Sequence, residues 1–142
     1  IIIHDLVEAY ATDIPAFDTM NNPEAKQLKM DNEIRAIEKI RDLMGGKTGQ
    51  LFYDLWFEFE HKATYEAKVA NALDKLEAQI QHNEADIETW LPIEFEMLFM
   101  LDKHTDFEPV LTAFKNLIVE EGICKLENAG IEVNQVKPST YM

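Results

Sequence analysis

The sequence predicts an all-α protein, and three observations support this fold class. Apolar residues recur at three- and four-residue steps along nearly the whole chain, which is the period of an amphipathic helix. No segment shows the alternation of a half-buried strand, and no repeat or Gly/Ser linker divides the chain. With 142 residues, 46% of them apolar, the chain can build one hydrophobic core. We expect one domain over residues 1–130 and a C-terminal tail over 131–142.

The first part of the chain has clear helix boundaries. Its predicted elements are the end of one helix, a loop and a longer helix, over residues 1–12, 13–22 and 23–44 in turn. Asn22 is a suitable N-cap, and Pro23 suits the first helical position because its missing N–H has no partner there in any case. Gly45 and Gly46 are expected to end this helix.

In the remainder of the chain, the apolar periodicity predicts four more helices, over residues 48–62, 64–83, 93–103 and 106–128. An aromatic stripe marks the first of them, and Thr64 is the expected cap of the second. In that second helix Val69, Leu73, Leu76 and Ile80 repeat at helical spacing. Short turns separate these helices, so we expect a bundle.

Charge and cysteine content exclude several classes of function. The chain has 27 acidic and 13 basic residues, hence a net charge of −14, which disfavours nucleic acid and anionic membrane surfaces as partners. The longest apolar run, residues 97–101, is far short of the ~20 residues that span a bilayer. Cys124 is the only cysteine, so no disulfide forms within the chain, and a reducing, cytoplasmic location is expected.

A polar cluster interrupts the apolar start of the chain. His4 and Asp5 follow three isoleucines, Glu8 lies one helical turn after the pair, and Asp13 follows in the loop. One imidazole and three carboxylates within ten residues suit a divalent metal ion with spare acid/base groups. The alternative, equally compatible with the spacing, is a cluster of helix caps and salt bridges.

A second unusual carboxylate lies far along the chain. Asp74 is on a helical stripe of small residues formed by Ala67, Ala70 and Ala78. Small side chains let another helix approach closely, and a covered carboxylate needs a partner such as a metal ion. The alternative is a solvent-facing Asp beside Lys75.

These residues carry a resemblance to a known family. Residues 4–15, HDLVEAYATDIP, resemble the central motif of the HD-domain metal-dependent phosphohydrolases. The similar branch contains the bacterial 5′-deoxynucleotidases and their eukaryotic HD-domain relatives. Residues 66–68, EAK, and 73–77, LDKLE, resemble the second motif of that branch, and the aromatic segment LWFE at 55–58 also fits.

The resemblance implies a helical HD-domain bundle that holds one divalent ion (Mn, Co, Mg, Zn, Ni or Fe) between helices. His4 and Asp5 match the metal-binding pair of the family, and Asp74 matches its distant metal-binding Asp. Glu8 and Asp13 match acidic positions that activate water and assist the leaving group. The implied reaction removes phosphate from nucleoside 5′-monophosphates, with deoxynucleotides favoured. The implied assembly is a homodimer, for which the aromatic helix at 51–59 is a candidate interface.

Two departures from the family pattern lie at and before this motif. The family has a further metal-binding His upstream, and its nucleotide-binding residues also lie partly upstream. We therefore expect the first helices of the bundle, with a fourth ligand, before Ile1, and this chain alone to be incomplete as a catalyst. Thr12 stands where the family commonly has Gly, which affects the path of the loop that carries Asp13. The alternatives are another HD-type hydrolase, acting on phosphodiesters or guanosine polyphosphates, and a non-catalytic helical interaction module.

Overall fold

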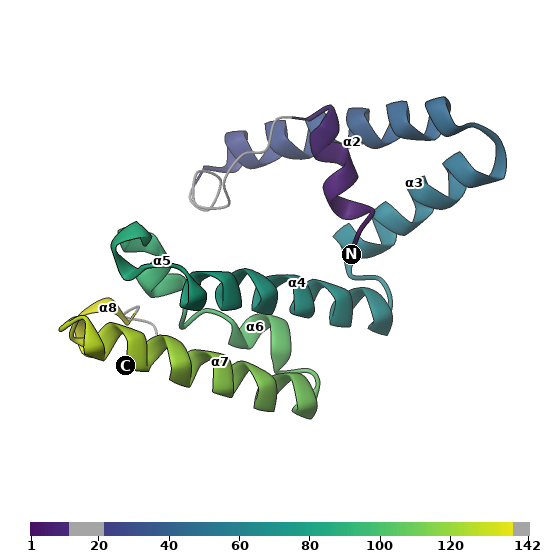
Figure 1. Ribbon diagram of the computed structural model, residues 1–142. Coiled ribbons are helices and arrows are strands. Elements are labelled where there is room, and N and C mark those ends of the chain that lie inside the picture. The colour runs from purple at the N-terminus through teal and green to yellow at the C-terminus, as the bar shows by residue number, and fades with distance from the viewer. Residues whose placement is uncertain (12–21, 138–142) are drawn as a thin grey trace. The chain divides into compact units, whose positions relative to one another are not determined.

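The computed structural model describes residues 1–11 and 22–137, and these residues form helices and no strands (Figure 1). The predicted all-α class is therefore confirmed. The chain divides into two compact units, Ile1–Lys68 and Val69–Met142, and the division falls within the first turns of helix α4. Each unit is described by itself, and the single domain expected over residues 1–130 stays a prediction.

The first unit is built from the short helix η1 (His4–Ala9) and the helices α2 (Pro23–Met44) and α3 (Gly46–His61). Helix α2 packs on both α3 and η1. Gly49 allows the close approach of α3 to α2, because a Cβ at this position would overlap the carbonyl oxygen of Arg41. The core of this unit is formed by small and apolar side chains: Val7, Ala11, Ala36, Ile37, Ile40 and Trp56.

The ends of α2 agree with the prediction, whereas the start of the chain differs. The Asn22 side chain accepts a hydrogen bond from the Ala25 N–H at 3.1 Å, and Gly45 ends the helix with φ +63°. Residues 1–12 were expected to be the end of a helix; within the described residues 1–11 the helix is η1, and it is a 3₁₀ helix of six residues.

The second unit contains the rest of α4 and all later elements. These are α4 (Tyr65–Glu84), η2 (Ile87–Thr89), α5 (Pro92–Met97), α6 (Asp102–Thr105), α7 (Pro109–Asn128) and α8 (Val133–Val136). Thr64 caps α4 as predicted, its Oγ1 accepting from the Ala67 N–H at 3.1 Å. Helix α8 lies within the segment expected to be a tail, and its valines pack against the core cluster of Trp90, Leu98, Phe99 and Leu126.

The single helix predicted over residues 93–103 is wrong, because the structure has two short helices with a break at 98–101. Leu98, Phe99 and Leu101 are all buried. In a continuous helix Leu98 and Leu101 would lie on one face, whereas Phe99 would point about 100° away from Leu98 and about 160° away from Leu101. The break lets all three enter the core.

A buried amide joins α4 to α7 in the second unit. The Asn83 Nδ2 donates to the Ile118 carbonyl oxygen at 2.9 Å and to the Glu121 carboxylate at 3.2 Å. Its Oδ1 accepts from the Gln79 Nε2 at 3.0 Å. Both amide side chains are buried. The bonds from Asn83 to α7 orient α4, the helix that carries Asp74, and the bond from Gln79 within α4 satisfies the Asn83 oxygen.

No helix among the described residues is long and apolar enough to cross a bilayer.

Candidate functional site

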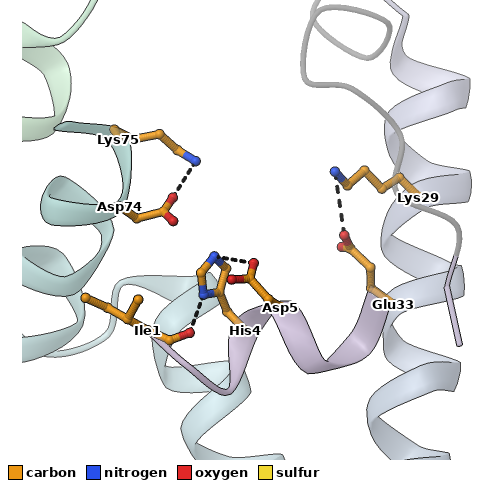
Figure 2. Close-up of polar contacts among 7 residues, drawn as sticks. All are labelled: Ile1, His4, Asp5, Lys29, Glu33, Asp74 and Lys75. Carbon is orange, nitrogen blue, oxygen red and sulfur yellow. Dashed lines mark hydrogen bonds and ion pairs between the residues drawn. The ribbon is translucent and has the colours of Figure 1, made fainter. Parts of the chain in front are cut away.

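The His4 side chain has three contacts, and Figure 2 shows the two to Ile1 and Asp5. Its Nδ1 makes a hydrogen bond with the Ile1 carbonyl oxygen, and its Nε2 lies 2.9 Å from the Asp5 Oδ1. The ring also stacks on Phe59, with centroids 4.4 Å apart and planes 28° apart. Helix η1 therefore presents His4 and Asp5 side by side, and α3 supplies the aromatic support.

These contacts constrain the chemistry of the imidazole. Because a carbonyl oxygen only accepts, the Nδ1 of His4 carries a hydrogen, and Nε2 is the nitrogen that faces Asp5. A backbone carbonyl on one ring nitrogen is the usual support for a histidine that binds metal through the other. Two ligand atoms at right angles, each about 2.1 Å from an ion, lie about 3 Å apart. The spacing of the two side chains is therefore compatible with a divalent cation between them. If Nε2 carries a proton, the same spacing is that of a salt bridge, which is the alternative that the sequence allows.

Glu8 lies in an acidic neighbourhood of the first unit. Burial raises the pKa of the Glu33 carboxyl above its usual value, Lys29 lowers it, and the charges of Glu60 and Glu8 raise it further. The Lys29 Nζ is 3.7 Å from the Glu33 Oε1 (Figure 2). The charges of Glu8 and Glu60 therefore both act on the Glu33 carboxyl and favour its protonated form.

Sequence reasoning missed both Glu33 and Phe59 as neighbours of this cluster. A signal for Glu33 was present, because Met30, Glu33, Ile34 and Ile37 lie on one helical stripe. A carboxylate on the core-facing stripe of α2 needs a nearby partner, and Lys29 is that partner. Phe59 gave no signal, since its contact with His4 joins residues 55 positions apart.

Asp74 is on α4 in the second unit. Its Oδ2 lies 2.7 Å from the Lys75 Nζ, and its side chain is 21% exposed (Figure 2). Asp74 is thus half-buried and ion-paired. From the sequence, either a covered carboxylate or a fully solvent-facing one was considered, and Asp74 is neither. A metal ion shared by Asp74, His4 and Asp5 stays a prediction.

Asp13 lies outside the described residues. Within residues 1–11 and 22–137, no group of three or more His, Cys, Asp or Glu side chains is arranged to hold a metal ion. Of the predicted site, the structure brings together His4 and Asp5, and it places Glu8 on the same short helix.

Comparison with known proteins identifies the family. A family model described as "HD domain" matches residues 1–114, which is most of the chain. The chain belongs to the HD-domain family. The predicted resemblance is thereby confirmed, and the His4-Asp5 pair of this HD-domain chain lies within the matched region.

Several relatives of this HD-domain chain carry the name 5′-deoxynucleotidase HDDC2. The protein of Xenopus laevis is 35% identical over 80 residues, that of Dictyostelium discoideum 34% over 80 residues, and that of Homo sapiens 30% over 83 residues. These alignments cover 56%, 56% and 58% of this chain and 38%, 40% and 39% of the relatives. The chain thus spans about two fifths of the length of the curated relatives it matches. No solved structure matches it significantly.

Proposed function

We propose that this HD-domain chain is part of a metal-dependent phosphohydrolase that removes phosphate from (deoxy)nucleoside 5′-monophosphates. The observation that carries the proposal is the pair of His4 and Asp5, whose ligand atoms lie 2.9 Å apart with the His4 ring fixed on its other side. The names of the relatives support the substrate class.

His4, Asp5 and Asp74 are the proposed ligands of one divalent ion, of which Mn, Co, Mg, Zn, Ni and Fe are all candidates. When bound, such an ion lowers the pKa of its water and polarises a phosphoryl oxygen. The Ile1 carbonyl and the Phe59 ring hold the His4 ring in place, so that Nε2 stays directed toward the proposed metal position.

Glu8 and Asp13 are the proposed proton-transferring residues. Glu8 accepts the proton of the attacking water, and Asp13 assists the departing nucleoside oxygen. Glu33 lies in the same electrostatic neighbourhood as Glu8. When Glu33 is negatively charged, it disfavours a negative charge on Glu8 as well. With a net charge of −14, the chain does not attract a phosphate monoester at long range, and attraction must come from the metal site itself.

A homodimer and a cytoplasmic location also belong to this proposal. Most aromatic side chains of α3 pack into the core cluster of the first unit, and the apolar residues left exposed on this helix are Leu51 and Leu55. These two leucines are the proposed dimer contact. Sedimentation of a clean monomer at micromolar concentration would contradict the dimer.

The activity is tested by phosphate release from a panel of ribo- and deoxynucleoside 5′-monophosphates. The complete encoded protein is assayed with each divalent ion in turn. We expect release that depends on an added ion and is faster for deoxynucleotides. No release with any ion would refute the proposal. Activity confined to phosphodiesters or guanosine polyphosphates would assign the chain to another kind of HD-domain hydrolase.

Matched variants separate a catalytic site from a helical interaction module. His4→Ala is compared with His61→Ala, because His61 is an exposed histidine whose ring contacts only Phe57 among the described aromatic residues. Asp74→Asn is compared with Glu77→Gln on the same helix. We expect both site variants to lose bound metal and at least ~100-fold in activity, and the controls to stay within about twofold. Equal metal content in all four variants would favour the module.

A further inference from the structure

The second unit contains a cavity of about 220 Å³, partly open to solvent, that is lined by the segment 98–101, α6, α7 and Lys137, the residue after α8. Its apolar wall is formed by Leu98, Phe99, Leu101 and Val119. The volume corresponds to about seven water molecules, which is enough room for a small organic ligand. Of the proposed metal and catalytic residues that the structure describes, His4, Asp5, Glu8 and Asp74, none lines it.

The polar wall of this cavity carries an excess of positive charge. Lys115 is only 9% exposed, and its ammonium group contacts the Asp102 carboxylate. Lys137 lines the same cavity, with its Nζ 5.3 Å from the centroid of the Phe99 ring. Two ammonium groups thus face one carboxylate, in a chain whose acidic residues outnumber its basic ones by 27 to 13.

The local charge is therefore opposite in sign to that of the whole chain. Burying the Lys115 side chain costs free energy, which the contact with Asp102 offsets. Lys137 adds a second cation at the same place, and among the described lining residues Asp102 is the only one with a carboxylate. An anionic group in the cavity would balance this charge, while the leucine and phenylalanine side chains would cover an apolar body.

We propose that this cavity binds a small monoanion with an apolar body, such as a medium-chain alkyl carboxylate. The carboxylate contacts the ammonium groups of Lys137 and Lys115, and the alkyl chain lies along Leu98, Phe99 and Val119. This is a second ligand site, separate in its residues from the proposed phosphohydrolase site, and it holds whether or not that activity is confirmed.

The test uses three probes that separate charge from apolar surface: octanoate, octanol and inorganic phosphate. Calorimetry is expected to give saturable binding of octanoate, with binding of octanol and of phosphate each weaker by about tenfold or more. Amide chemical-shift changes with octanoate should centre on residues 98–102, 115–119 and 137.

Charge recognition is tested by Lys137→Met, with Lys103→Met as the control. Both lysines are exposed, but Lys103 does not line the cavity. We expect Lys137→Met to weaken octanoate binding about tenfold and to leave octanol binding unchanged, and Lys103→Met to change neither. Because Lys115 is buried, Lys115→Met is informative only if its circular dichroism and urea midpoint match the parent, and Lys137→Met carries the test by itself.

Several results would overturn the proposal. The first is the absence of saturable octanoate binding at millimolar concentration. Equal affinity for octanoate and octanol would show that the lysines recognise no charge, and phosphate binding as tight as octanoate binding would show that the apolar wall contributes nothing. Chemical-shift changes centred on the first unit would place the ligand elsewhere.

Discussion

Replacing Asn83 with alanine is expected to destabilise the second unit by about 3–5 kcal/mol. The variant loses the hydrogen bonds to the Ile118 carbonyl and from Gln79, each worth about 1 kcal/mol. Gln79 is 3% exposed, so its stranded amide adds a desolvation penalty of about 1–3 kcal/mol. The bond to Glu121 adds little, because that side chain is exposed and water replaces its partner.

The two tryptophans allow each unit to be followed separately. Trp56 is in the core of the first unit, and Trp90 is in a core cluster of the second, with its Nε1 donating to the His82 carbonyl at 2.8 Å. In a Trp56→Phe background, urea denaturation followed by fluorescence therefore reports on the second unit. We expect Asn83→Ala to lower the urea midpoint without a large change in slope.

Asn128→Ala is the matched control, because Asn128 is exposed on α7 and its amide contacts only the Cys124 sulfur among the described side chains. Its effect should lie within about 0.5 kcal/mol. A double-mutant cycle with Gln79→Ala should show a coupling of about 0.5–3 kcal/mol. A loss below 1 kcal/mol for Asn83→Ala, or strict additivity with Gln79→Ala, would refute the assigned role of the buried amide.

Three further predictions concern the first unit and the start of α4. Thr64→Ala should lower the free energy of unfolding by about 1 kcal/mol, because the Ala67 N–H loses its cap, and Thr64→Ser should retain it; urea titration measures both. For Glu33, burial raises the pKa on folding, so the native state binds the proton more tightly than the unfolded chain. The stability that this tighter proton binding adds is present below the ordinary pKa of 4.5 and is lost as the pH rises through the raised pKa. Glu33→Gln should therefore flatten the fall of the urea midpoint above pH 4.5. An unchanged dependence of the urea midpoint on pH would contradict this. Phe59→Leu removes the ring stacked on His4 and should weaken metal binding about tenfold in an equilibrium titration, whereas Phe59→Tyr should restore it; equal affinity in all three proteins would exclude a positioning role.

The features that the sequence predicted correctly depend on neighbouring residues. The helical period, the cap at Asn22, the stop at Gly45 and the cap at Thr64 involve residues within four positions of one another. The proximity of His4 and Asp5 has the same origin, because adjacent residues on a short helix keep their side chains close. These features were available before any tertiary contact was known.

Tertiary structure decided the remainder. The break at 98–101 lets Phe99 be buried together with Leu98 and Leu101, and burial depends on what surrounds the segment. The ring of Phe59 beneath His4 and the charge of Glu33 near Glu8 come from other helices. The two lysines of the cavity come from α7 and from the residue after α8. Sequence spacing gives the direction of a side chain on its own helix. The residue that a side chain meets across the core is determined only when the helices pack. That neighbour then sets the solvation and the charge of the side chain.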